Sequence, residues 1–167
     1  MGTGGSSRYF CKTHLMINNS FSSNRRQTFK ILTWNCNGLL TRKLELTHYI
    51  QIHDIDIVLL SETHLTSRST AKIHGYQLYT CNNPDDFSHG GSAIYIKSNI
   101  THHSLPPYCT SGIQLTTISA QLHCGTEVNV GAIYCPPIPT IHEDQFTDAF
   151  SRLGPKWIIG GAHNAEH

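Results

Sequence analysis

Polar side chains follow three strand-like apolar runs in the sequence. Asn35 follows the first run, Glu62 follows the second, and Asn164 lies just beyond the third. Ligands of open α/β sheets collect at the carboxyl ends of the strands, so we expect these three strand ends to form one site. Ala162, at the end of the third run, is the exception because it carries no polar side chain.

The segment Ser61–His64 places a carboxylate directly after a buried strand. A carboxylate at such an edge can bind a hard cation such as Mg²⁺, which takes few protein oxygens and keeps several of its waters. Asn35 would supply a neutral oxygen beside Glu62. The alternative interpretation is that Glu62 is a solvated residue at a strand end and binds nothing.

Tyr134 ends a later strand-like run and precedes the turn Cys135-Pro136-Pro137. A tyrosine hydroxyl at a strand end can donate to a phosphoryl oxygen and stabilise developing charge. The alternative is a tyrosine at the edge of the core, with no role in chemistry.

None of the twelve histidines is singled out by the sequence. His163 and His167 are spaced like one half of a zinc site, but no second ligand pair accompanies them, so the metal interpretation is weak. His64 or His89 could act as a base, and with so many histidines the choice between them stays open.

The strands and helices that must position these residues begin with a βαβ unit. We expect a strand at Phe29–Trp34, a helix at Thr41–His53 and a strand at Asp54–Ser61, with the two strands parallel. Thr41 is the expected N-cap of the helix, and Leu40, Leu44 and His48 share one of its faces.

The rest of the chain is richer in strands. Turn residues separate four β-rich segments, and a helix and a strand follow. These segments are Tyr76–Thr80, Ser92–Lys97, Ile113–His123, Glu127–Tyr134, the helix Ile141–Leu153 and the strand Lys156–Gly160. In the helix, Phe146, Ala149, Phe150 and Leu153 share one face. The pattern predicts a mixed α/β fold.

Composition limits the classes of protein to which the chain can belong. Its 167 residues suit one domain with a real core, and no apolar run approaches the roughly 18 residues of a membrane helix. The chain shows no signal peptide, and its six cysteines form no CxxC pair, so we expect free thiols in a reducing compartment.

Charge is distributed unevenly along the chain. Residues 1–28 carry four basic residues and no acid, and we expect a mobile basic extension there, with a short strand near Tyr9–Cys11 as the alternative. The remaining residues, 29–167, carry 12 − 4 = 8 basic and 11 acidic residues, a net charge of −3. Charge alone therefore does not indicate a nucleic-acid binder.

Five motifs in order carry a resemblance to a known family. They are WNxNGL, SETHL, GGSAIYI, IYCPP and WIIGGxxNAxH, within Phe29–His167. This string resembles the endonuclease/exonuclease/phosphatase superfamily, and within it the apurinic-type endonuclease of non-LTR retrotransposons. The resemblance implies a four-layer α/β sandwich, with two mixed sheets face to face and helices outside. It also implies phosphodiester cleavage with a divalent metal, usually Mg²⁺, or Mn²⁺.

The resemblance also implies roles for individual residues. Asn35 and Glu62 match the metal-site positions, Tyr134 matches the tyrosine that contacts phosphate, and Asn164 matches the asparagine of a Gly-Asp-x-Asn motif. The glycines at 90 and 91 match a structural pair, and Asn37 stands where some relatives carry aspartate.

Two departures from the family pattern affect the expected activity. Ala162 stands where the motif has the aspartate that orients or deprotonates the attacking water. The closing Ser-Asp-His segment, which carries a catalytic histidine, is absent from the sequence. We therefore expect residues 29–167 to be a partial domain, truncated before the second sheet is complete, with marginal stability and weak metal binding.

Three functional interpretations remain open at the level of sequence. The first is a retrotransposon-type endonuclease fragment, inactive or impaired, that acts on DNA. The second is a non-catalytic module on the same fold that binds nucleic acid or protein. The third is a phosphatase or phospholipase branch of the superfamily. The resemblance implies a nuclear location and neither a membrane nor a small-molecule cofactor, and an exposed sheet edge would allow self-association.

Overall fold

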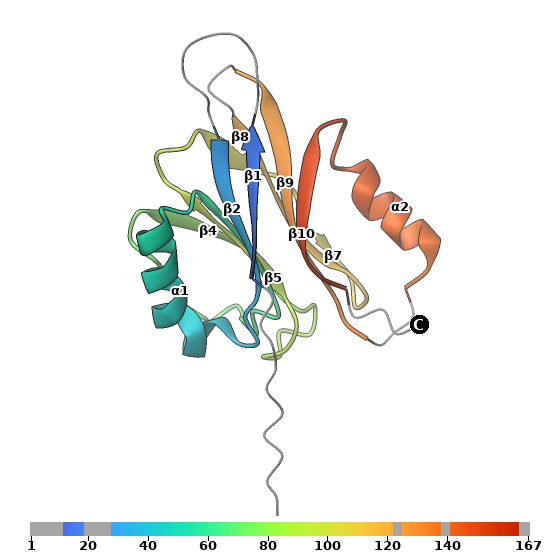
Figure 1. The fold of residues 1–167 in the computed structure, drawn as a ribbon. Helices are drawn as coiled ribbons and strands as arrows, with labels where there is room; N and C mark the ends of the chain where they lie inside the picture. Colours follow the sequence, from blue (N-terminus) through green and yellow to red (C-terminus); the bar gives the residue numbers. More distant parts are fainter. Residues whose placement is uncertain (1–11, 19–27, 122–124, 138–140, 164–167) are drawn as a thin grey trace, which may run out of the picture.

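The chain folds into two β-sheets that pack face to face (Figure 1). The computed structural model describes residues 12–18, 28–121, 125–137 and 141–163. Sheet A has the strand order β1-β2-β3-β5-β4 and contains both parallel and antiparallel pairs. Its strands are β1 (Lys12–Asn18), β2 (Thr28–Asn35), β3 (Ile57–Ser61), β4 (Tyr76–Cys81) and β5 (Ser92–Lys97).

Sheet B is also mixed, with the order β10-β9-β8-β6 and with β7 paired to β8. The pair β9 and β10 is parallel, and β8 runs antiparallel to β9. Its strands are β6 (His102–Ser104), β7 (Tyr108–Cys109), β8 (Gln114–Gln121), β9 (Glu127–Cys135) and β10 (Trp157–His163).

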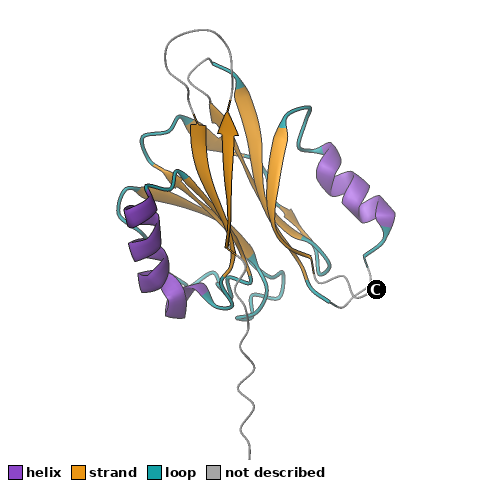
Figure 2. Cartoon of the chain, viewed as in Figure 1, coloured by secondary structure: helices purple, strands orange, loops and turns teal. Residues whose placement is uncertain are grey.

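Three apolar clusters hold four layers together. The middle cluster joins sheet A residues such as Ile57 and Ile94 to sheet B residues such as Ile118 and Val130. Helix α1 (Leu39–His53) covers the outer face of sheet A, and helix α2 (Glu143–Ser151) covers that of sheet B (Figure 2). This arrangement confirms the expected α/β sandwich of two mixed sheets flanked by helices.

Helix α1 begins earlier than expected. Its N-cap position is Gly38 and no side chain caps it, so the prediction of Thr41 as the N-cap was wrong. The Thr41 hydroxyl instead donates to the Gly38 carbonyl oxygen at 2.9 Å. The Leu39 amide donates to the Thr63 carbonyl at 2.9 Å, and this bond fixes the start of the helix against the end of β3.

The buried face of α1 is not the one that shares Leu40, Leu44 and His48. Leu40 is 51% exposed and Leu44 is 84% exposed. Leu39, Leu46 and Ile50 are buried instead. Because the bond from Leu39 fixes the rotation of the first turn, the neighbouring Leu40 faces solvent, and so do the residues four and eight positions later.

The amino-terminal region differs from the expected mobile extension at residues 12–18. These residues form β1 and pair antiparallel with β2, from Lys12 opposite Trp34 to Asn18 opposite Thr28. Pairing satisfies backbone groups that β2 would otherwise present as an open sheet edge. Residues 1–11, with the strand considered at Tyr9–Cys11, and residues 19–27 lie outside the described residues.

Most other element boundaries moved by one to three residues. The strand expected from Asp54 begins at Ile57, because Asp54 is the left-handed C-cap of α1, with φ 52°. The predicted parallel pairing of the first two strands of the βαβ unit is confirmed by β2 and β3. The expected face of the second helix is also confirmed, since Ala149 and Leu153 are buried and Phe146 and Phe150 pack beside them.

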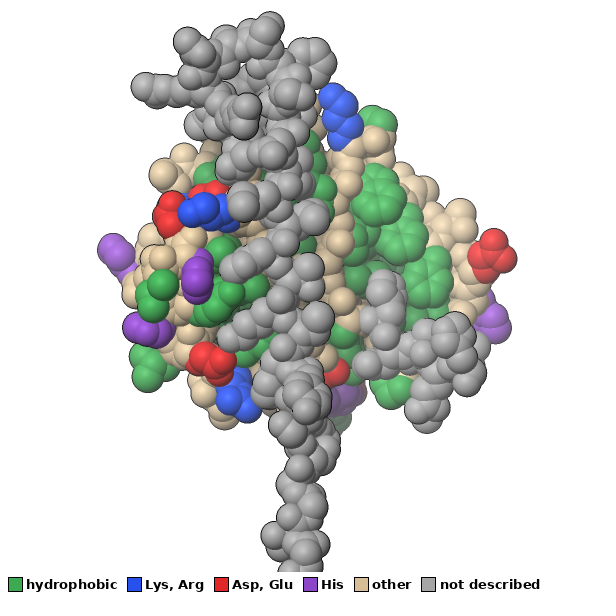
Figure 3. Space-filling model, viewed as in Figure 1, with side chains coloured by type: hydrophobic (Ala, Val, Ile, Leu, Met, Phe, Trp, Pro, Cys, Tyr) green, Lys and Arg blue, Asp and Glu red, His purple; other side chains and the backbone are tan. Residues whose placement is uncertain are grey.

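Aromatic side chains stack along the outer side of sheet B. Phe146 stacks on Phe150 with ring centroids 5.8 Å apart, and Phe150 stacks on Trp157 at 5.9 Å. Figure 3 shows hydrophobic side chains gathered over this side of the molecule, beside α2 and β10.

Neither described helix has the length and apolar character needed to cross a lipid bilayer.

Candidate active site

Strand register aligns two rows of residues, one in each sheet. The sheet A row is Asn35, Ser61, Ser92 and Cys81. The sheet B row is Ala162, Tyr134, Gln114 and Cys109. The Gly91 amide donates to the Gln114 side-chain oxygen at 3.1 Å. Gly91 immediately precedes Ser92 of the sheet A row, so this bond joins the two sheets. We call the region between the two facing rows the seam.

The turns after β2 and β3 are tied together by backbone hydrogen bonds. The Cys36 amide donates to the Ser61 carbonyl at 3.0 Å, and the Gly38 amide donates to the Glu62 carbonyl at 2.8 Å. The structure therefore brings the Asn35 and Glu62 segments to one edge of sheet A, as the sequence predicted for the ends of parallel strands.

Three residues of these turns have left-handed backbone conformations without being glycine. They are Asn37 (φ 43°), Glu62 (φ 54°) and His64 (φ 53°). Such conformations cost about 1–3 kcal/mol each and gather at functional sites, where the surrounding structure enforces them. Three of the five such residues in the described part of the chain therefore lie at this one edge.

Glu62 has the chemistry of a cation ligand. It is partly buried, and within the described residues its carboxylate has neither a hydrogen-bond donor nor an ion-pair partner. The Asn35 side-chain oxygen accepts the Asn37 amide at 3.2 Å, which orients the amide and leaves a second lone pair. Oxygen donors of this kind fit Mg²⁺ or Mn²⁺.

The donor set around Glu62 is nonetheless small. The described residues contain no group of three or more histidine, cysteine, aspartate or glutamate side chains that could hold a metal ion. One carboxylate and one amide fit a hydrated ion that keeps most of its waters, and they do not fit a tightly held structural metal.

Tyr134 faces this edge from sheet B. Its side chain is 8% exposed, and burial raises the pKa of its hydroxyl, with the negative charge of Glu62 acting in the same direction. The hydroxyl is therefore protonated at neutral pH and can donate a hydrogen bond. In the parallel register of β9 and β10, Ala162 lies directly beside Tyr134.

The glycine pair at 90 and 91 sits where side chains would not fit. A β-carbon on Gly90 would lie 3.0 Å from the Tyr134 ring, and one on Gly91 would lie 2.7 Å from the Thr63 hydroxyl oxygen. Both glycines have positive φ, 61° and 82°. The pair thus lets the loop before β5 approach Tyr134 and the end of β3 closely.

The two candidate base histidines lie near the same edge. Burial lowers the pKa of His64, Glu62 opposes this shift and His89 adds to it. His64 is therefore neutral at pH 7, while the exposed His89 ring lies 3.4 Å from the Asp85 carboxylate. Asn164 and His167 lie outside the described residues, as does the side chain of His163.

The buried polar groups of the seam were not predicted from the sequence. Gln114 is fully buried, accepts the Gly91 amide and donates to the Thr110 carbonyl at 3.0 Å. The Ser92 and Thr116 hydroxyls are 2.8 Å apart and link β5 to β8. The available signal was the set of polar residues that this strand carries among apolar ones, Gln114, Thr116, Thr117 and Ser119.

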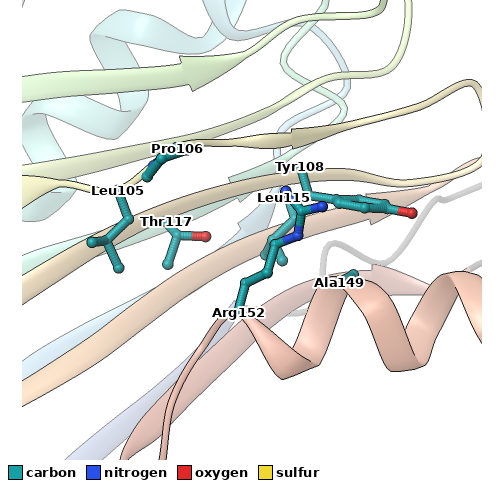
Figure 4. A pocket seen from close by; sticks show the side chains of 7 residues that line it. All are labelled: Leu105, Pro106, Tyr108, Leu115, Thr117, Ala149 and Arg152. Carbon is teal, nitrogen blue, oxygen red and sulfur yellow. The ribbon is translucent and has the colours of Figure 1, made fainter.

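A cavity of about 240 Å³ lies away from this edge, between β8 and α2 (Figure 4). Its lining is mostly apolar, and the Arg152 guanidinium sits 5.0 Å from the Tyr108 ring centroid at one side of it. None of the residues in the site at the sheet edge lines this cavity. The candidate site lies at an edge between the two sheets, apart from this cavity.

Comparison with known proteins identifies the family. The family model described as Endonuclease/Exonuclease/phosphatase family matches residues 32–161. The chain is 39% identical over 140 residues to the RNA-directed DNA polymerase from mobile element jockey of Drosophila melanogaster. It is 37% identical over 139 residues to the probable RNA-directed DNA polymerase from transposon X-element of the same species.

These alignments cover 84% and 83% of this chain but 15% of each relative, so the chain spans a small part of their length. Among solved structures, the fold resembles the endonuclease domain of TRAS1, a telomere-specific non-LTR retrotransposon. That match has a TM-score of 0.66 and 18% identity, and covers 83% of this chain and 60% of the other. The chain therefore belongs to the endonuclease/exonuclease/phosphatase family.

Proposed function

We propose that the chain is part of the endonuclease domain of a mobile-element polymerase, and that this copy is impaired in the family reaction, metal-dependent nicking of DNA. The relatives named as mobile-element polymerases support the first part. One observation carries the second part: Ala162, which lies beside Tyr134, stands where the family pattern has aspartate.

In this proposal, residues at the ends of sheet A strands bind the metal, and Tyr134 of sheet B binds the phosphate. Glu62 and Asn35 would hold a divalent ion, and Asn164, which matches the asparagine of the family motif, would act as a catalytic residue. When bound, the ion supplies positive charge that polarises a phosphate and offsets the charge that develops on it. Tyr134, kept protonated by burial and by Glu62, donates a hydrogen bond to a phosphate oxygen.

The position of Ala162 explains the proposed impairment. A methyl group accepts no proton and cannot orient a water for attack on phosphorus. In a catalytic unit whose members act together, the loss of one member removes most of the rate, and restoring one of several recovers little. The metal-binding half of the site is thus retained without the group that would activate water.

A plasmid-nicking assay in Mg²⁺ and in Mn²⁺ tests this proposal. The unmodified chain and Ala162→Asp alone should both stay near background. Ala162→Asp joined to the C-terminal segment of an active relative, which supplies Ser-Asp-His, should nick supercoiled DNA, and the same graft with Ala162 retained is the matched control. Glu62→Ala or Asn164→Ala in the active graft should abolish nicking.

Two results would overturn the proposal. Nicking by the unmodified chain that is lost in Glu62→Ala would show that the copy is active. A folded graft that carries Ala162→Asp and still fails to nick would remove the endonuclease assignment. If that graft hydrolyses a phosphate monoester instead, the phosphatase branch of the family becomes the better assignment.

Ala162 also favours a second candidate, a non-catalytic module that binds nucleic acid. The net charge of −3 over residues 29–167 argues against strong phosphate-backbone binding by the folded part. Fluorescence anisotropy with labelled duplex DNA tests this candidate, on the chain and on a variant with Arg8, Arg25 and Arg26 changed to Gln. Tight binding that needs no Glu62 would support the module, and a nuclear location of the intact protein would agree with either candidate.

A further inference from the structure

The end of the seam opposite Ala162 holds two cysteines. Cys81 is the last residue of β4 in sheet A, and Cys109 is the last residue of β7 in sheet B. Each occupies the outermost position of its row, so the two cysteines end the two rows on the same side of the seam. Both are free thiols, Cys81 buried and Cys109 exposed.

The hydrogen bonds of the two thiols cross. The Cys81 thiol donates to the Tyr108 carbonyl at 3.6 Å, and the Cys109 thiol donates to the Asn82 carbonyl at 3.1 Å. Each thiol thus reaches the residue next to the other cysteine. The crossing of these two bonds places the two cysteines side by side.

We propose that Cys81 and Cys109 are a reversible disulfide site that links sheet A to sheet B. The two residues have different roles because they differ in exposure. Cys109 is accessible to an oxidant in solution, and Cys81 lies behind it and resolves the first product. This arrangement, an accessible thiol beside a sheltered second thiol, is the one that favours an intramolecular disulfide over a lasting mixed disulfide.

The oxidant is a low-molecular-weight disulfide, for which glutathione disulfide is the probe. The Cys109 thiolate attacks one glutathione sulfur, forms a mixed disulfide and releases one glutathione thiolate. Cys81, after giving its proton to solvent, attacks the Cys109 sulfur and releases the second glutathione thiolate. Two protein thiols are oxidised to one disulfide, and one glutathione disulfide is reduced to two thiols.

The disulfide would lie next to the loop that contains Gly91, beside the candidate site. A β-carbon on Gly91 would lie 3.4 Å from the Cys81 carbonyl oxygen, and Gly91 is the residue that bonds Gln114 across the seam. A covalent bond at this end closes a loop of chain between β4 and β7 and lowers the entropy of the unfolded chain. Oxidation should therefore raise the thermal unfolding midpoint.

Peptide mapping of the full chain tests the proposal. The protein is equilibrated with mixtures of oxidised and reduced glutathione, its free thiols are alkylated, and the digest is analysed by mass spectrometry. The expected product is a Cys81–Cys109 cross-linked peptide that disappears on reduction. A Cys11→Ser/Cys124→Ser variant, run in parallel, excludes the two cysteines that the structure does not describe.

Two single variants and two internal controls sharpen the result. Cys81→Ala should retain glutathione on Cys109, and Cys109→Ser should leave Cys81 as a free thiol with an unfolding midpoint that no longer rises on oxidation. Cys36 and Cys135, both buried, should stay unmodified. Glutathione retained on wild-type Cys109 without the cross-link, or a cross-link that leaves the midpoint unchanged, would overturn the proposal.

Discussion

The inner part of the seam and the end that carries the candidate site differ in how their polar groups are held. At the inner part, Gly91 bonds Gln114 and Ser92 bonds Thr116, so buried groups of one sheet satisfy those of the other. At the site end, sheet A carries the Asn35 and Glu62 oxygens, while sheet B offers the Tyr134 hydroxyl and the Ala162 methyl group. The side chains that join the two sheets are thus distinct from the candidate site residues.

The largest effect should come from filling the space beside Gly91. Gly91→Ala places a methyl group 2.7 Å from the Thr63 hydroxyl oxygen at φ 82°, whereas Gly125→Ala meets nothing within 4 Å at a similar φ of 79°. Gly91→Ala should lower the free energy of unfolding by about 3 kcal/mol, and Gly125→Ala by about 1 kcal/mol, in urea titrations. Equal losses would show that the seam is not tightly packed there.

Removing one partner of the buried hydroxyl pair should have the next largest effect. Thr116→Val keeps the shape of the side chain but leaves Ser92 without its hydroxyl partner, and should cost about 1–3 kcal/mol of unfolding free energy. The control Thr117→Val, at a neighbouring position lining the cavity near α2, should change stability by less than about 0.5 kcal/mol. A similar loss in both variants would contradict a specific role for the pair.

The site end should respond in metal affinity and not in stability. Ala162→Asp adds a carboxylate to sheet B and should tighten Mn²⁺ binding about tenfold, or about 1.4 kcal/mol, in calorimetric titrations. Glu62→Gln should remove the binding heat in both backgrounds. Heats that are the same with and without Glu62 would show that the ion binds elsewhere.

The smallest effect is expected far from the site end, where β5 finishes. A hydrogen bond from Lys97 to Asp54 holds the pKa of that carboxyl below its usual range. The unfolded chain therefore binds the proton more readily, so this contribution to stability is present above about pH 4 and is lost as the pH falls through the folded-state pKa. Because the Asp54 side chain is 74% exposed, solvent screening keeps the effect small.

Urea unfolding between pH 2 and pH 6 measures this contribution, with Lys97→Met against the exposed control Lys72→Met. Lys97→Met should flatten the acid limb of the stability curve, and Lys72→Met should leave it unchanged. An acid limb of the same slope in Lys97→Met would remove Lys97 as its cause.

Much of the fold could be predicted from the sequence, because its apolar runs are long and clearly separated. The βαβ unit, the second helix with its buried face, and the two mixed sheets are confirmed, and the relatives confirm the family resemblance. The face of α1 could not be predicted, because apolar side chains occur all round it and the bond from Leu39 to Thr63 decides its rotation. β1 could not be predicted either, because it forms by pairing with β2, which lies further along the chain.

The candidate site is a different case. The structure brings Asn35, Glu62 and Tyr134 to one edge, but their roles stay predictions, and Asn164 lies outside the described residues. Gln114 could not be recognised from local sequence, because its importance comes from Gly91, which is 23 residues away along the chain. Contacts between two sheets are set by packing and not by periodicity.

The division of the chain between the sheets has a consequence for its synthesis. The described strands of sheet A all lie within residues 12–97, and those of sheet B all lie within residues 102–163. A ribosome therefore completes sheet A before the first described strand of sheet B leaves the exit tunnel. Until then, Ile31, Leu59 and Ile94 have no partner sheet, so the nascent chain exposes an apolar face that chaperones are suited to cover.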